Sequence, residues 1–278
     1  MQPNNKLGVL ETLARWGYGA RGAVYLIVGG LAFADAFYPG QESVDTKGAL
    51  QKIISQPFGD VLLGLVAVGL VGYALWRVVQ AVADVDGHGS GFKGVAVRGG
   101  LLISAVTHVL LAFFAVSLIF GWGTGNGGGD DSAYQDWTAR LLSQEFGQWL
   151  VAGVGAVIVL VGIVHMTKGF TSRFKKYVEV DRAGRWADPV CRFGLVARGV
   201  VFAIIGGFFV VAALHFSSGE VKGLKGALNV LETQPFGPWL LGAVGLGLVA
   251  FAVYSFIEAA YRRINPPDID VEAIRRAV

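Results

Sequence analysis

The chain has little charge for its length and almost no cysteine. Only 15% of its 278 residues are Asp, Glu, Lys or Arg, whereas soluble domains average about 25%. Its one cysteine, Cys191, excludes an intramolecular disulfide and any metal site built from several cysteines. The four histidines fall at different depths along the apolar segments, which is not the arrangement of a metal site. We therefore expect no metal and no other cofactor.

Catalytic motifs are missing as well. The sequence contains no Ser/His/Asp or Cys/His arrangement and no Walker lysine motif. We predict no catalytic residue and expect that the protein is not an enzyme. The net charge is +3, but the basic residues are not gathered on one soluble module, so nucleic acid is not an expected partner.

Long apolar segments dominate what is present, since 54% of the residues are hydrophobic. A membrane-spanning helix needs about 20 consecutive apolar residues. Six segments meet this length, and helices satisfy their own backbone hydrogen bonds in lipid. The six predicted spans are residues 18–38, 59–83, 95–120, 147–169, 194–216 and 237–260.

The distribution of Lys and Arg predicts the orientation. Most of the 23 basic residues fall on the side that holds both ends of the chain, and the positive-inside rule places that side in the cytoplasm. The lipid bilayer is thus the expected partner of this multi-pass plasma-membrane protein. The loop of residues 168–185, from Lys168 to Arg185, is basic enough to bind anionic lipid headgroups.

Two short motifs occur three times. Arg-Gly pairs open the first span of each repeat, and Gln-x-Phe-Gly tetrads open the second. The predicted hairpin repeats are residues 14–85, 91–177 and 186–264, followed by a cytoplasmic tail at 265–278. Parallel repeats are related by an axis along the membrane normal. The sequence therefore predicts an all-α bundle of six membrane helices, in three parallel two-helix repeats with quasi-threefold symmetry.

The tetrads are predicted to be structural turns at the outer surface. Their phenylalanines can occupy the interface, and their glycines allow close approach to a neighbouring segment. Short amphipathic helices are expected just before them at residues 45–55 and 223–233. The residues of the three turns are Gln56, Phe58, Gly59, Gln144, Phe146, Gly147, Gln234, Phe236 and Gly237.

These motifs resemble a known bacterial family of integral membrane proteins, domain of unknown function number 1206. The resemblance rests on the Ala-Arg-Gly openings at residues 20–22 and 197–199, the Lys-Gly-Ala-Leu blocks at 47–50 and 225–228, and the Gln-Pro-Phe-Gly turns. It covers residues 14–264 and implies three pairs of transmembrane helices. Repeat two departs at Glu145 and lacks the Lys-Gly-Ala-Leu block. The resemblance implies no activity.

Two sets of polar residues are candidate sites. Ser104, Thr107 and His108 share one face of the third span by their spacing, and they serve either as a proton relay or solute contact or as an interhelical hydrogen bond. The repeat arginines Arg21, Arg98 and Arg198 are predicted to form a cytoplasmic ring, with Glu258 as a counter-ion. These arginines either extend to the interface or form a site for an anion or lipid headgroup.

Two functions follow from these features. Sparse charge inside the membrane and the missing catalytic constellation favour a non-catalytic scaffold or accessory subunit. The alternative is a transporter or channel for a small solute or ion along the pseudo-threefold axis, which the symmetry and the stripe at His108 would suit.

Overall fold

The structure, a computed structural model, describes residues 5–38, 43–122 and 130–264, so that the predicted tail lies outside the described residues. These residues form nine α-helices and three short 3₁₀ helices. Six of the α-helices are long and apolar enough to cross a membrane. They are α1 (Asn5–Phe37), α3 (Gly59–Val82), α4 (Phe92–Phe120), α6 (Gly147–Phe170), α7 (Ala187–Leu214) and α9 (Gly237–Tyr261).

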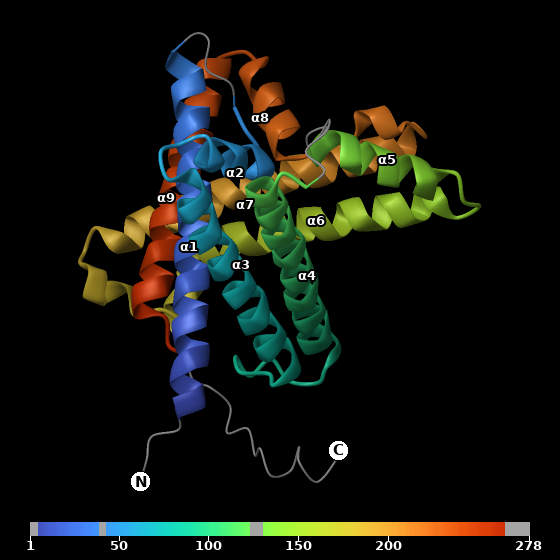
Figure 1. The fold of residues 1–278 in the computed structure, drawn as a ribbon. Coiled ribbons are helices and arrows are strands. Elements are labelled where there is room, and N and C mark those ends of the chain that lie inside the picture. Colours follow the sequence, from blue (N-terminus) through green and yellow to red (C-terminus); the bar gives the residue numbers. More distant parts are fainter. Residues whose placement is uncertain (1–4, 39–42, 123–129, 265–278) are drawn as a thin grey trace.

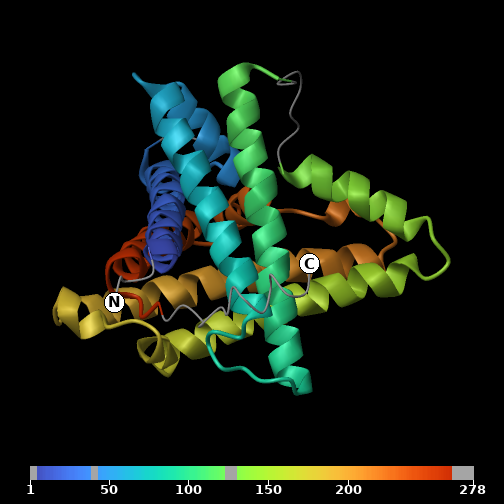
Figure 2. The same cartoon turned by 60° about the horizontal axis from the view of Figure 1, so that its bottom comes forward.

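The six spans form three tightly packed pairs. The pairs are α3 with α4, α6 with α7, and α9 with α1. In each pair the second span of one repeat packs against the first span of the next, and the last repeat closes onto the first. Figures 1 and 2 show the three pairs pointing in three different directions around a shared centre. This cyclic order is the quasi-threefold arrangement expected for three parallel repeats.

Repeats one and three also pack internally, through equivalent small residues. A Cβ atom on Gly69 of α3 would overlap the side chain of Ala20 on α1, and one on Gly247 of α9 would overlap Ala197 on α7. Small residues of this kind let the backbones of membrane helices approach closely. The two spans of repeat one, α1 and α3, therefore pack against each other, and so do the two spans of repeat three, α7 and α9.

The two spans of repeat two do not pack against each other in this way. Its two spans, α4 and α6, are not among the packed helix pairs, although every residue of both is described. Val97 and Val157 occupy the positions equivalent to Ala20 and Gly69, counted from the Arg-Gly pair and from the tetrad. Val157 is 56% exposed, so the small-residue contact of the other two repeats is absent here, and α4 and α6 do not form a packed pair.

A short helix precedes the second span of every repeat. The helices α2 (Thr46–Ile54) and α8 (Leu224–Glu232) lie within the two segments predicted to be helical. Repeat two, expected only to have a longer loop, contains α5 (Asp130–Leu142). The Lys-Gly-Ala-Leu block is thus not required for this helix.

The three tetrads form similar turns. The amide of the tetrad glycine donates to the carbonyl of the tetrad glutamine, at 2.8 Å for Gly59, 2.9 Å for Gly147 and 2.8 Å for Gly237. A Cβ atom on any of these glycines would overlap a carbonyl oxygen of the preceding short helix, which explains why glycine occurs there. Phe58 and Phe236 have left-handed backbones with φ of 61°, whereas Phe146 has φ of −105°.

Three segments meet at one end of the molecule, which we call the basic end. They are the loop of residues 83–91, the segment of residues 171–186 and the end of α9. Val178 forms a backbone bridge with Arg262, and the amide of Arg263 donates to the carbonyl of Tyr177 at 2.9 Å. Towards the opposite end, a large apolar core joins α1, α2, α3, α8 and α9 through residues such as Val28, Leu50 and Leu228.

Candidate functional site

A cavity of about 120 Å³ lies between the spans at the basic end, and all six spans contribute lining residues. A site shared by all three repeats is expected where the pseudo-threefold axis passes. Ionisable groups are concentrated there. Five basic side chains and two carboxylates line the cavity: Arg21, Arg77, Lys168, Arg198 and Arg262, with Asp86 and Glu258.

Glu258 is the centre of the charge pairing. It is 2% exposed, and one carboxylate oxygen pairs with Arg21 of α1. Its other oxygen accepts a hydrogen bond of 2.7 Å from Arg262. The Arg21 guanidinium also donates to Ser255 at 3.1 Å and to the hydroxyl of Tyr73 at 2.7 Å. Because each charged group has several partners, this burial is compatible with a stable fold.

The pairing continues into a closed loop of interactions. Arg262 reaches Asp86 at 3.4 Å, and Asp86 accepts a hydrogen bond of 2.7 Å from the Gln80 amide. Gln80 in turn accepts from Arg77 at 3.0 Å, and Arg77 donates to the same Tyr73 hydroxyl that Arg21 contacts. We call this closed set of seven residues the charged ring. Its members are Arg21, Tyr73, Arg77, Gln80, Asp86, Glu258 and Arg262.

Arg262 follows the end of α9, and its charge state depends on the ring. Burial disfavours the charged guanidinium, but Tyr18 and the nearby carboxylates of Glu258 and Asp86 favour it, and the pKa of Arg262 is raised above its ordinary value. Arg262 is therefore a permanent cation that ties α9 to the loop of residues 83–91.

That loop has an internal brace. The carboxylate of Asp84 accepts hydrogen bonds of 2.7 Å from the amides of His88 and Gly89. These bonds favour the ionised form and lower the pKa of Asp84. The brace holds the loop beside the cavity, which His88 and Asp86 also line.

Two cations in the cavity lie outside the charged ring. Arg198 packs between aromatic rings, with its guanidinium carbon 4.3 Å from the ring centre of Phe251, 5.0 Å from Phe202 and 5.1 Å from Tyr25. Its Nε atom is buried without a hydrogen-bond partner in the described part of the chain. Lys168 likewise forms no hydrogen bond or ion pair with another described residue.

The structure therefore brings together only some residues of the predicted arginine ring. Arg21, Arg198 and Glu258 meet at the cavity, but Arg98 does not line it. The guanidinium of Arg98 donates instead to the carbonyls of Ala81 and Val82, the latter at 3.1 Å, where it caps the end of α3. Arg77 of α3 supplies a guanidinium to the cavity in its place.

The predicted polar stripe on α4 lies outside the cavity lining. The His108 Nδ1 atom is 2.7 Å from the carbonyl oxygen of Ser104, and the Thr107 hydroxyl donates to the same oxygen at 2.9 Å. The imidazole also packs on Tyr73, with ring centres 4.5 Å apart. The Thr107 hydroxyl and the Nδ1 atom of His108 therefore both lie against the Ser104 carbonyl within α4, and the stripe contacts the charged ring through the Tyr73 side chain.

Several site residues are not marked by the repeated motifs, although the sequence contains a signal for them. Aligning the second spans on their tetrads places Arg77, His165 and Ser255 at one equivalent position. The same alignment places Gln80, Lys168 and Glu258 at another, one helical turn further on. All six line the cavity or bond to a residue that does. Equivalent positions of the three repeats thus converge on one site with different chemistry from each.

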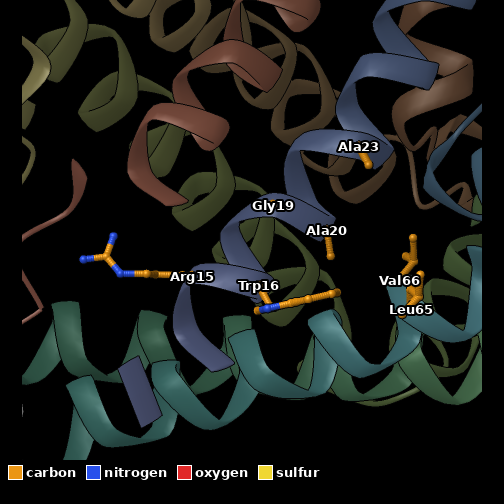
Figure 3. Close-up of a pocket in the computed structure, with 7 residues that line it drawn as sticks. All are labelled: Arg15, Trp16, Gly19, Ala20, Ala23, Leu65 and Val66. Carbon is orange, nitrogen blue, oxygen red and sulfur yellow. The ribbon is translucent and has the colours of Figure 1, made fainter. Parts of the chain in front are cut away.

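A second hollow carries no comparable chemistry. It measures about 410 Å³ and lies between α1 and α3, where it is lined mainly by small and apolar residues such as Ala20, Ala23 and Leu65 (Figure 3). Arg15 stands at its edge, and its side chain points away from Leu65 and Val66 in Figure 3. It donates to the carbonyls of Ala259 and Ala260 at 2.7 and 2.8 Å. We interpret this hollow as a groove open to lipid.

The fold and the cavity define a multi-pass, all-helical membrane protein with a charged centre. Comparison with known families then shows that the chain belongs to the family described as Domain of Unknown Function (DUF1206), whose model matches residues 16–84, 99–172 and 193–262. Each matched segment lies inside one of the three predicted repeats.

The chain is also similar to the uncharacterized protein YxxB of Bacillus subtilis (strain 168), with 33% identity over 262 residues that cover 92% of each chain. No solved structure matches the fold. Neither the family nor this relative carries a described activity, so any function must be argued from the site.

Proposed function

We propose that the protein carries a small anion across the plasma membrane through the central cavity, without catalysing a chemical reaction. The observation that supports this most is the excess of positive charge: five cations face two carboxylates in a cavity lined from all six spans. Charged groups inside a membrane are expensive and mark ion or substrate pathways. An anion in the cavity would offset the unpaired part of this charge.

The other proposed function, a scaffold or accessory subunit, accounts less well for this arrangement. A scaffold needs tight helix packing, which the glycine contacts between α6 and α7 and between α1 and α9 supply. A scaffold does not account for Arg198 and Lys168, which line the cavity without a hydrogen-bond or ion-pair partner among the described residues. The geometry therefore favours the transport proposal.

Passage through the molecule would require a conformational change. The apolar core around Val28, Leu50 and Leu228 closes the end opposite the cavity. Transporters built from repeats alternate access by moving one group of helices against another around a central site. The unpacked pair α4 and α6 is the place in this ring where such movement would disrupt the fewest contacts.

We further propose that the basic end faces the cytoplasm, as the positive-inside rule requires. Both termini are then cytoplasmic, and the segment between α6 and α7 meets the inner leaflet. Its exposed Arg182 and Arg185 suit anionic lipid headgroups. This composition gives no support for a nucleic-acid partner.

A flux assay tests the transport proposal. The full-length protein is reconstituted into liposomes, and uptake of chloride, nitrate, sulfate and inorganic phosphate is measured under an imposed gradient. We expect uptake of one or more of these anions above protein-free liposomes, and a loss of that uptake in Arg198→Gln. Equal rates with and without protein for all four anions would refute transport and leave the scaffold.

A further inference from the structure

The cavity contains two kinds of cation, and the difference between them indicates where a ligand would bind. In the charged ring, Arg21 and Arg262 form ion pairs with Glu258 and Asp86. Arg77 donates there to neutral partners, the Gln80 amide oxygen and the Tyr73 hydroxyl. Lys168 and Arg198 stand outside that ring on the same cavity wall. Of the basic groups on that wall, only these two have no polar partner among the described residues.

Arg198 is held in a way that leaves its donors available. Aromatic rings of Phe251, Phe202 and Tyr25 surround the guanidinium at 4.3 to 5.1 Å. A cation–π contact engages the face of the guanidinium, whereas its five N–H groups project from the edge. The aromatic contacts thus fix the side chain and leave the N–H groups without an acceptor.

Lys168 lies near Arg198 because α6 and α7 run antiparallel in close contact. A Cβ atom on Gly162 would be 2.6 Å from the carbonyl oxygen of Gly199, and one on Gly169 would be 2.9 Å from that of Arg192. In this register Lys168 lies on the facing helix, about 7.5 Å nearer to the basic end than Arg198. The two cations can therefore act on one ligand.

We propose that Arg198 and Lys168 bind a tetrahedral oxyanion of the phosphate class in this cavity. A guanidinium edge matches the paired oxygens of such a group, and an ammonium adds a point charge. The excess of three positive charges favours a doubly charged anion over a singly charged one. The inference rests on the proposed anion function and supplies its substrate class.

The volume limits the size of the ligand. A water molecule needs about 10–15 Å³ of cavity space, so about 120 Å³ accommodates a group of several heavy atoms. A phosphate group fits, whereas a whole nucleotide would not. The group can arrive free in solution past His88 in the loop, or on a lipid past Lys168, whose side chain is exposed.

A binding experiment on the purified full-length protein tests the site. Inorganic phosphate and dihexanoyl phosphatidic acid are titrated separately by calorimetry in a zwitterionic detergent, with chloride at matched ionic strength as the reference anion. We expect one or both phosphate compounds to bind more tightly than chloride. Binding of inorganic phosphate identifies a free anion as the source, and binding of the short-chain lipid alone identifies a headgroup.

Variants then locate the binding. Arg198→Gln should weaken binding by about tenfold or more, because hydrogen bonds to a charged group are lost, and Lys168→Gln should weaken it to a smaller extent. Lys93→Gln removes a positive charge from the exposed start of α4 and should leave binding unchanged. Phosphate binding no tighter than chloride, or wild-type affinity in both cavity variants, would overturn the inference.

The two proposals can fail separately. Phosphate binding without any anion flux would retain the binding site and reject transport. Chloride flux without phosphate binding would retain transport and reject the phosphate class.

Discussion

Gly162 of α6 and Gly199 of α7 are in reciprocal contact. A Cβ atom added to either glycine would lie 2.6 Å from the carbonyl oxygen of the other. The same helices repeat this arrangement at Gly155 and Gly206, where the corresponding distances are 2.8 and 2.7 Å. In the α6–α7 pair, the two helix backbones are therefore in direct contact.

Substituting Gly162 should separate these helices. We expect Gly162→Ala to destabilise the protein by about 1–3 kcal/mol, because the added methyl group cannot fit without moving a backbone. Gly153→Ala on the same helix is the matched control, since nothing lies within 4 Å of its Cβ position. Unfolding in sodium dodecyl sulfate, followed by circular dichroism, measures both. Equal stability of the two variants would contradict the packing described.

Glu258 should be among the most sensitive positions of the fold. Glu258→Gln leaves Arg21 and Arg262 without their shared carboxylate, and breaking a buried pair of this kind costs about 3–5 kcal/mol. The same unfolding assay measures the loss. Glu11→Gln is the control, because Glu11 pairs with Arg15 near the surface and such pairs contribute at most about 1 kcal/mol.

A double variant separates charge pairing from packing at the same site. Arg21→Met combined with Glu258→Gln should recover part of the stability lost in Glu258→Gln alone, since one unpaired cation is removed. The stability of Arg21→Met alone is measured as well. If the double variant loses as much stability as the two single variants lose together, the two residues are not coupled.

The outer turns allow a test of backbone strain. Phe58 and Phe146 occupy the same tetrad position and are 83% and 70% exposed, but only Phe58 has a left-handed backbone. A residue with a side chain loses about 1–2 kcal/mol of stability in the left-handed conformation, whereas glycine adopts it without this cost. We expect Phe58→Gly to be more stable than Phe146→Gly by about this amount in thermal unfolding. The reverse order would exclude strain at Phe58.

Single-cysteine labelling tests the proposed orientation. In a Cys191→Ala background, Lys175→Cys should react with a membrane-impermeant maleimide only after the cells are opened. Asp136→Cys in α5 should react from outside in intact cells. The opposite pattern would invert the topology and place the cavity at the extracellular end.

Much of the fold could be predicted because the tetrads mark helix starts. The second spans begin at Gly59, Gly147 and Gly237, at the predicted residues. The first span was less accurate, since α1 begins at Asn5 rather than near Tyr18. Polar residues such as Glu11 and Arg15 hide this extension from a search for apolar segments.

The site was harder to predict than the fold. Arg21 and Arg198 were found because each belongs to a repeated Arg-Gly pair. Arg77 and Lys168 were missed because their repeat equivalents differ in chemistry, so that no repeated letter marks them. Arg98 was placed wrongly because its guanidinium donates to carbonyls at the end of α3, a contact that becomes apparent only when the helices are placed.

The equivalent positions Gln80, Lys168 and Glu258 show what joining three hairpins into one polypeptide makes possible. Three separate copies of one hairpin would have to present three identical side chains there, and three carboxylates or three ammonium groups side by side would repel one another. Within a single chain, one copy can hold an acid, one a base and one a neutral amide. A single polypeptide thus frees this position from symmetry, and the charge of the cavity can be set one residue at a time.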